Sequence, residues 1–218
     1  MNRALILPPV AFALAAVLCL ASRPSNAAAQ AAGAAGHEHH KMMMAEAAPV
    51  PSAARPMERQ PAVDGIALVD MQGRTVMLDE ALEADVPVMV NFIFTTCTTI
   101  CPVMSAGFAQ LQKRVAAEGG RVRLVSISID PEVDTPARLR EYAARRGAGP
   151  DWVFLTGPPA ASEAAQRAFG AFRGSKEAHT ADTYVRRNST APWERIEGLA
   201  SGEALLRAFN NAASGGQR

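Results

Sequence analysis

The stretch that decides the fold spans residues 86–102 and reads VPVMVNFIFTTCTTICP. Its first half, residues 86–94, is almost continuously apolar, which is typical of a β-strand buried on both faces of a sheet. Beyond Pro102, apolar residues recur every three or four positions from Met104 to Val115. This spacing predicts an amphipathic helix that packs on the sheet. The two cysteines therefore lie in the connection between a buried strand and the helix that follows it.

The rest of residues 61–218 alternates strands and helices in the same way. A turn at Asp70–Gly73, between two short apolar runs, predicts a hairpin over residues 66–77. Further strands are predicted at 122–129, 152–155, 183–187 and 193–197, and further helices at 136–146, 161–172 and 201–211. The prediction is one α/β domain, residues 61–218, with a central mixed sheet flanked by helices and an N-terminal hairpin.

Charge and cysteine content exclude some classes of function. The chain has 22 Lys and Arg against 21 Asp and Glu, a formal net charge of +1. Such a balance offers no basic face for nucleic acid, so no nucleic-acid partner is expected. Three cysteines are too few for a disulfide scaffold, and one of them, Cys19, lies in an N-terminal targeting segment. The functional question therefore concerns the remaining pair.

Residues 1–27 have the layout of a secretory signal peptide. Arg3 precedes an apolar stretch over residues 4–21, and Ser25-Asn26-Ala27 is a cleavage pattern of small residues. The alternative is an uncleaved anchor that tethers the chain to the inner membrane through residues 4–21, although Pro8-Pro9 interrupt that marginal span. Either interpretation predicts export to the periplasm, where a disulfide can form and persist.

Residues 28–60 are predicted to form a disordered linker, because they are rich in alanine and contain no aromatic residue that could build a core. The linker carries a His/Met-rich tract made of His37, His39, His40, Met42, Met43 and Met44. Imidazole and thioether groups bind copper well. Because a disordered segment fixes no geometry, a secondary copper site and an ordinary solvated tail are equally favoured.

Cys97 and Cys101 admit three interpretations. A structural disulfide would close a loop so small that it would add little stability. Thiol–disulfide exchange is favoured by position, since a helix N-terminus favours the thiolate, although redox motifs usually have two intervening residues rather than three. Metal binding is the third interpretation. Zinc would need further cysteines that residues 61–218 lack, whereas copper(I) accepts two thiolates and one imidazole.

His179 is the one histidine in residues 61–218, in a predicted loop before the strand at 183–187. A lone loop histidine is usually solvated. Its presence in an exported domain with a cysteine pair makes it the candidate third ligand. Asp130 and Asp134 follow the strand at 122–129, where strand termination and helix capping are their favoured roles. The alternative is a supporting role beside a metal.

Together these residues resemble the Sco/SenC family of copper-binding, thioredoxin-like proteins, over about residues 61–212. The resemblance is carried by Val69-Asp70-Met71-Gln72-Gly73, Cys97-x-x-x-Cys101-Pro102, Ser128-Ile129-Asp130-Pro131 with Asp134-Thr135-Pro136, His179 five residues before Tyr184, and Ile196-Glu197-Gly198-Leu199. It implies a thioredoxin-like fold. It also implies that Cys97, Cys101 and His179 are the ligands of copper, as Cu(I) or Cu(II).

The resemblance implies a function as well. The family serves assembly of the binuclear copper centre of cytochrome c oxidase, as a metallochaperone or as the reductant of that centre's cysteines. The implied partner is the copper-accepting subunit of that oxidase, or another exported copper protein. As a reductase, the chain would use Cys97 and Cys101 as a catalytic redox pair, with Cys97 as the attacking sulfur. An inert interaction domain, the third class considered, would leave both cysteines and His179 unused.

The chain departs from the family pattern in two places. Thr98 stands where many members have Pro, and Glu177-Ala178 stand where Val-Asp is common. Both changes keep the implied ligand set and leave the redox potential and the client protein open.

Overall fold

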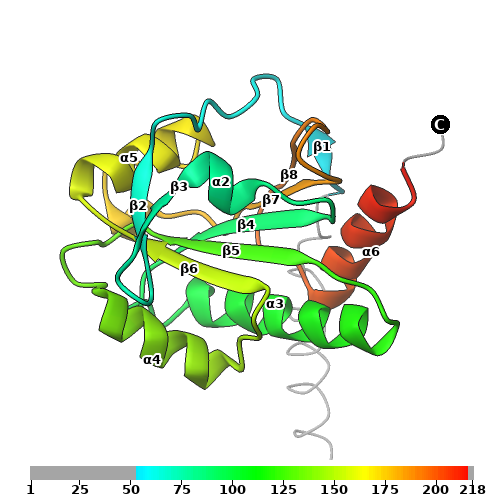
Figure 1. The fold of residues 1–218 in the computed structure, drawn as a ribbon, viewed down its shortest axis with the longest axis horizontal. Coiled ribbons are helices and arrows are strands. Elements are labelled where there is room, and N and C mark those ends of the chain that lie inside the picture. Colours follow the sequence, from blue (N-terminus) through cyan, green and yellow to red (C-terminus); the bar gives the residue numbers. More distant parts are fainter. Residues whose placement is uncertain (1–52, 216–218) are drawn as a thin grey trace, which may run out of the picture. The chain divides into compact units, whose positions relative to one another are not determined.

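A mixed β-sheet forms the centre of the computed structural model, which describes residues 53–215 (Figure 1). Within these residues the sheet has eight strands. In order across the sheet they are β1 (Arg55–Pro56), β8 (Glu194–Ile196), β7 (Thr183–Arg186), β4 (Val88–Ile93), β5 (Arg123–Ser128), β6 (Trp152–Thr156), β2 (Ala67–Asp70) and β3 (Thr75–Met77). β4, β5 and β6 run parallel, and the other neighbouring pairs are antiparallel. The predicted mixed sheet and its N-terminal hairpin, β2–β3, are confirmed.

Helices cover both faces of this sheet (Figure 1). On one face lie α3 (Ile100–Ala117), α4 (Pro136–Arg146) and α6 (Gly202–Ala213), and on the other lie α2 (Leu78–Leu82) and α5 (Pro159–Ala168). Strand β4 is buried along its whole length. Because side chains alternate along a strand, Met89 and Ile93 join the core beside α3, whereas Val90 and Phe92 join the core beside α5. The continuous apolar run in the sequence thus reflects two covered faces.

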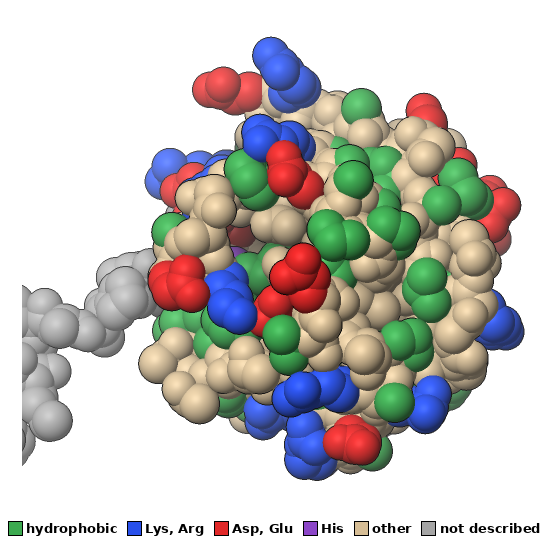
Figure 2. Space-filling model, turned by 90° about the vertical axis from the view of Figure 1, so that its left-hand side faces the viewer, with side chains coloured by type: hydrophobic (Ala, Val, Ile, Leu, Met, Phe, Trp, Pro, Cys, Tyr) green, Lys and Arg blue, Asp and Glu red, His purple; other side chains and the backbone are tan. Residues whose placement is uncertain are grey.

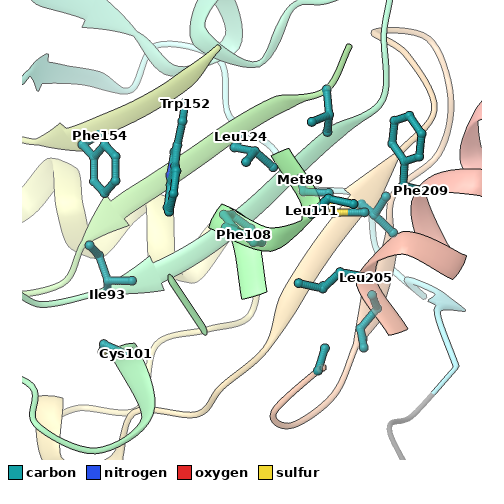
Figure 3. Packing of buried hydrophobic residues seen from close by; sticks show 14 of the residues in the cluster. Met89, Ile93, Cys101, Phe108, Leu111, Leu124, Trp152, Phe154, Leu205 and Phe209 are labelled. Carbon is teal, nitrogen blue, oxygen red and sulfur yellow. The ribbon is translucent and has the colours of Figure 1, made fainter. Parts of the chain in front are cut away.

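The core beneath α3 extends as far as the cysteine pair (Figure 3). Phe108 of α3 meets Trp152 edge to face, with ring centroids 5.7 Å apart, and Trp152 stacks on Phe154 at 5.0 Å. Cys101 belongs to the same cluster, and Figure 3 places it beside Ile93 at the end of β4. Close packing of this kind fixes the start of α3 relative to the sheet.

Strands β4 and β5 end at one edge of the sheet, since their register pairs Ile93 with Ser128. The loop after β4, residues 94–99, therefore lies beside the loop after β5, residues 129–135. In open α/β sheets, ligands bind at the carboxyl ends of the strands. Helix α4 starts from the second loop as predicted, with Thr135 Oγ1 accepting a hydrogen bond from the Arg138 N–H.

Some boundaries differ from the sequence prediction. Helix α5 ends at Ala168 rather than at Phe172, because Gly170 adopts a φ of +64°, the left-handed conformation that terminates helices. Helix α2 and the 3-10 helix η1 (Lys176–Ala178) are not predicted, since a segment of three to five residues shows no hydrophobic period.

The N-terminal part of the described chain also differs. Residues 53–60 are assigned to the linker by sequence, yet they contain β1, and the Met57 N–H donates to the Trp193 carbonyl at 3.0 Å. Strand β1 pairs with β8 through backbone groups, so no pattern of side chains in the sequence predicts it. The predicted signal peptide or anchor and the His/Met-rich tract lie outside the described residues. Over residues 53–215, no helix is long and apolar enough to cross a membrane.

Candidate functional site

The two cysteines lie at the junction of the β4–α3 loop and helix α3. Cys97 is in the loop, where its N–H donates to the Phe94 carbonyl at 3.1 Å, and Cys101 is the second residue of α3. Both thiols are free, and the Cys101 N–H points at Cys97 Sγ across 3.4 Å. Cys97 is 9% exposed and Cys101 is fully buried. The helix start thus supplies a donor to the sulfur nearer to solvent, as the sequence position predicts.

The surroundings give the two thiols opposite acidities. Burial alone would raise the pKa of the Cys97 thiol, but hydrogen bonds from Cys101 and Thr99 outweigh it, and the pKa of Cys97 is lowered. Burial raises the pKa of Cys101 to about 12, and the charges of Cys97 and Asp134 add to that effect. Cys97 is therefore the more reactive sulfur in the metal-free protein.

Asp134 fixes the loop that carries Cys97. This carboxylate is fully buried and accepts hydrogen bonds from the Thr95 N–H at 3.1 Å, from the Thr95 hydroxyl at 2.5 Å and from the Ser128 hydroxyl at 2.7 Å. The cap of α4 is Thr135 instead. The capping role favoured for Asp134 from sequence is therefore wrong. Asp134 ties the β4–α3 loop to the β5–α4 loop.

His179 follows η1 and packs against the residue that opens the cysteine loop. Its ring meets Phe94 edge to face, with centroids 6.3 Å apart. Burial lowers the pKa of His179, although the Phe92 backbone and the charge of Asp182 oppose the shift. The imidazole is therefore neutral at neutral pH. Among the described residues, its Nε2 is buried and has no hydrogen-bond partner. A buried nitrogen with a free lone pair suits a metal ligand.

The structure brings together only part of the predicted ligand set. Cys97 and Cys101 are in contact, and His179 lies beside Phe94, three residues before Cys97. Within residues 53–215, no group of three His, Cys, Asp or Glu side chains is close enough to hold one metal ion. His37, His39, His40 and Met42–Met44 lie outside the described residues. The donor set fits a soft metal ion, and the side chains of His179 and the two cysteines would have to close together to complete a three-ligand site.

Sequence reasoning missed two charged side chains that hold the His179 segment. Lys176 Nζ lies 2.6 Å from Asp130 Oδ2, on one side of His179. On the other side, buried Asp182 accepts from the Thr180 hydroxyl at 2.9 Å and pairs with Arg195 at 2.8 Å. Neither pair leaves a sequence signal, because the partners of Lys176 and Asp182 come from other strands and loops.

Figure 2 views the end of the molecule at which β4 and β5 finish. Hydrophobic side chains lie there among acidic and basic ones. Val103, near the start of α3, is 50% exposed, and Leu199, before α6, is 38% exposed.

Comparison with known proteins gives consistent results. A sequence model described as SCO1/SenC matches residues 56–212. The SCO1 protein homolog of Bacillus subtilis (strain 168) is 43% identical over 96 residues, which are 44% of this chain and 49% of that protein. The chain thus spans about half the length of that relative.

Two solved structures extend the comparison. BsSco, a member of the Sco family of cytochrome c oxidase assembly proteins with a disulfide switch, is 27% identical with a TM-score of 0.57, over 77% of this chain and 96% of that one. Arabidopsis thaliana ScoI, solved with copper bound, is 22% identical with a TM-score of 0.59, over 71% and 99% of the two chains. The similarity to Arabidopsis thaliana ScoI is one of fold.

The fold and the cysteine pair between β4 and α3 define a thioredoxin-like protein. Because the family match covers well over half of its length, the chain belongs to the SCO1/SenC family.

Proposed function

We propose that this protein is an exported copper metallochaperone that serves assembly of the binuclear copper centre of cytochrome c oxidase. Its cargo would be held by the Cys97 and Cys101 thiolates and by neutral His179. The observation that carries the proposal is the unpartnered, buried Nε2 of His179 beside the loop that bears the free cysteine pair. Two thiolates and one imidazole suit Cu(I), and a low coordination number leaves a path for transfer.

The proposed partner is the copper-accepting subunit of the oxidase, or another exported copper protein. Residues 1–27 would direct export to the periplasm, as a cleaved signal peptide or as an inner-membrane tether through residues 4–21. Support comes from Sco relatives that carry copper and from BsSco, which belongs to a family of oxidase assembly proteins.

A second function, reduction of a client disulfide, is favoured by the different acidities of the two thiols. The Cys97 thiolate would attack one client sulfur, forming a mixed disulfide and releasing the other client sulfur as a thiolate that takes up a proton. Cys101, losing its proton, would then displace the second client sulfur. The client ends with two thiols and this chain with a Cys97–Cys101 disulfide.

Anaerobic Cu(I) titration of the reduced protein, against a competing chelator, tests the ligand set. Cys97→Ser and Cys101→Ser should each abolish tight binding, because a hard hydroxyl replaces a soft thiolate. His179→Ala should weaken binding while leaving reduction of a model disulfide unchanged. Binding by the His179→Ala variant as tight as that of the parent would refute the three-ligand site.

A transfer assay separates the two functions. A chaperone should pass copper to an apo acceptor in a one-to-one ratio, whereas a reductase should reduce the acceptor's disulfide in the absence of copper. The His179→Ala variant discriminates between them, since only the first activity should decline.

A further inference from the structure

The segment that carries His179 is anchored by an ion pair that none of the motifs reveals. Lys176 Nζ lies 2.6 Å from Asp130 Oδ2; the Lys176 side chain is 37% exposed and that of Asp130 only 11%. This hydrogen bond raises the pKa of Lys176. Lys176 and His179 are joined by the backbone of η1, since the His179 N–H donates to the Lys176 carbonyl at 3.2 Å. The ion pair therefore anchors the short turn from which His179 follows.

The other partner of the ion pair is fixed to the cysteine loop. The Asp130 carbonyl accepts from the Asp134 N–H at 2.9 Å, and the Asp130 N–H donates to Ser128 Oγ at 3.1 Å. The Asp134 carboxylate in turn holds Thr95, two residues before Cys97. A continuous chain of hydrogen bonds thus runs from the histidine segment, through the β5–α4 loop, to the loop that carries Cys97.

Phe94 adds a second link between the two segments. Lys176 Nζ lies 5.8 Å from the centroid of the Phe94 ring, and the His179 ring lies 6.3 Å from it. Loss of the ion pair would free the start of η1. His179 would then be held by its contact with Phe94 and by the bonds of Asp182 to Thr180 and Arg195.

We propose that Lys176 is a positioning residue, which through its ion pair with Asp130 keeps His179 beside the cysteine loop, in the arrangement from which its side chain can close on the two sulfurs, and so sets the affinity for copper without touching metal or sulfur. This inference rests on the proposed function, since it assumes that His179 is a copper ligand. An affinity falls by the fraction of time for which the binding-competent arrangement is populated. If release of the ion pair leaves His179 in place about one fifth of the time, the copper dissociation constant rises about fivefold.

The test compares Lys176→Met, which keeps an apolar stem and removes the charge, with Lys176→Arg, which restores a cation that can reach Asp130. The readouts are Cu(I) affinity by chelator competition and the visible thiolate-to-copper absorption of the Cu(II) form. Lys176→Met should weaken Cu(I) binding about fivefold and alter the absorption. Lys176→Arg should keep both the affinity and the absorption of the parent protein. The thiol–disulfide equilibrium of Cys97 and Cys101 should stay unchanged. Arg207→Met, which removes an exposed ion pair with Glu203 on α6, is the matched control and should change nothing.

Combination with His179→Ala separates the two proposals. In that background Lys176→Met should have no further effect, because there is no imidazole left to position. If His179→Ala weakens binding but Lys176→Met does not, or if the two effects multiply, the positioning role is wrong and the copper site stands. If His179→Ala itself has no effect, both proposals are overturned. Thermal unfolding of each variant shows whether any loss of affinity comes from loss of fold, which would also overturn the positioning role.

Discussion

Cys97 and Cys101 are four residues apart, yet their environments differ sharply. Cys97 Sγ accepts a hydrogen bond from the backbone N–H of Cys101 and is also hydrogen-bonded by Thr99. Cys101, in contrast, lies in the apolar cluster beneath α3. Sequence alone predicts the helix start and its preference for a thiolate. It does not predict that Cys101 is fully buried, because that burial depends on side chains of other elements, such as Ile93 of β4 and Tyr142 of α4, which only the fold brings there.

The reactivity of the two thiols is therefore predicted to differ. Because the pKa of Cys97 is lowered and that of Cys101 is raised to about 12, a much larger fraction of Cys97 than of Cys101 is thiolate at pH 7. Iodoacetamide should modify Cys97 at least about tenfold faster, even though a more acidic thiolate is the weaker nucleophile. Mass spectrometry after timed alkylation of the anaerobic, reduced protein measures both rates.

The alkylation rates of the two thiols should also depend on pH in different ways. Because its pKa is lowered, Cys97 should reach its full alkylation rate at a lower pH than a free thiol does, and Cys101 should still be rising at the highest pH tested. Cys101→Ser changes only a side chain and keeps the backbone N–H that donates to Cys97 Sγ, so Cys97 should keep its reactivity. Faster modification of Cys101 than of Cys97 would contradict this account of the loop.

The β4–α3 and β5–α4 loops meet at the carboxyl edge of the sheet, because β4 and β5 are paired up to their last residues. Asp134 accepts three hydrogen bonds from Thr95 and Ser128 in a fully buried setting. Without the carboxylate, these donors would lose their partner at a site that water does not reach. Unsatisfied buried donors are costly.

Asp134→Ala is predicted to destabilise the protein by about 3 kcal/mol, from the lost charged hydrogen bonds and the unpaired donors left behind. Ser128→Ala, which removes one of the three bonds and leaves the Asp134–Thr95 link, should cost about 1 kcal/mol. Urea unfolding of both variants measures the difference. Equal costs would mean that the link between the two loops contributes nothing.

The strands and long helices could be predicted from sequence because their periods are local. The 3.6-residue stripe of α3 and the buried run of β4 are visible without any knowledge of the fold. The environment of His179 could not be predicted, since it depends on Phe94 and Asp130, which lie in other segments, and on the pairing of Asp182 with Arg195 of β8. The same holds for β1, whose two residues pair through backbone groups.

For the whole molecule, the His/Met-rich tract and the folded domain form one chain. A weak copper site at residues 37–44 would act at high effective concentration toward Cys97, because the intervening chain tethers it. Since β1 begins at Arg55, a deletion of residues 28–52 removes the tract and leaves the sheet intact.

That deletion is predicted to remove a second, weaker copper equivalent and to slow loading of the domain at limiting copper. The weaker equivalent should be lost on acidification through about pH 6.5, where free imidazoles take up protons. Stopped-flow loading and equilibrium titration check both effects. A replacement of residues 28–52 by a Gly/Ser linker of equal length is the control. Unchanged stoichiometry and loading rate would reduce the tract to a solvated tail.

The most direct measurement of the central claim is Cu(I) titration of the domain in its reduced form and in its Cys97–Cys101 disulfide form, side by side. Because the disulfide uses both sulfurs, the oxidised domain should bind essentially no copper at this site, while the reduced domain binds one equivalent tightly. Bound copper should in turn protect the thiols from oxidation. Equal affinity of the two forms would contradict the account, since the metal would then be held elsewhere.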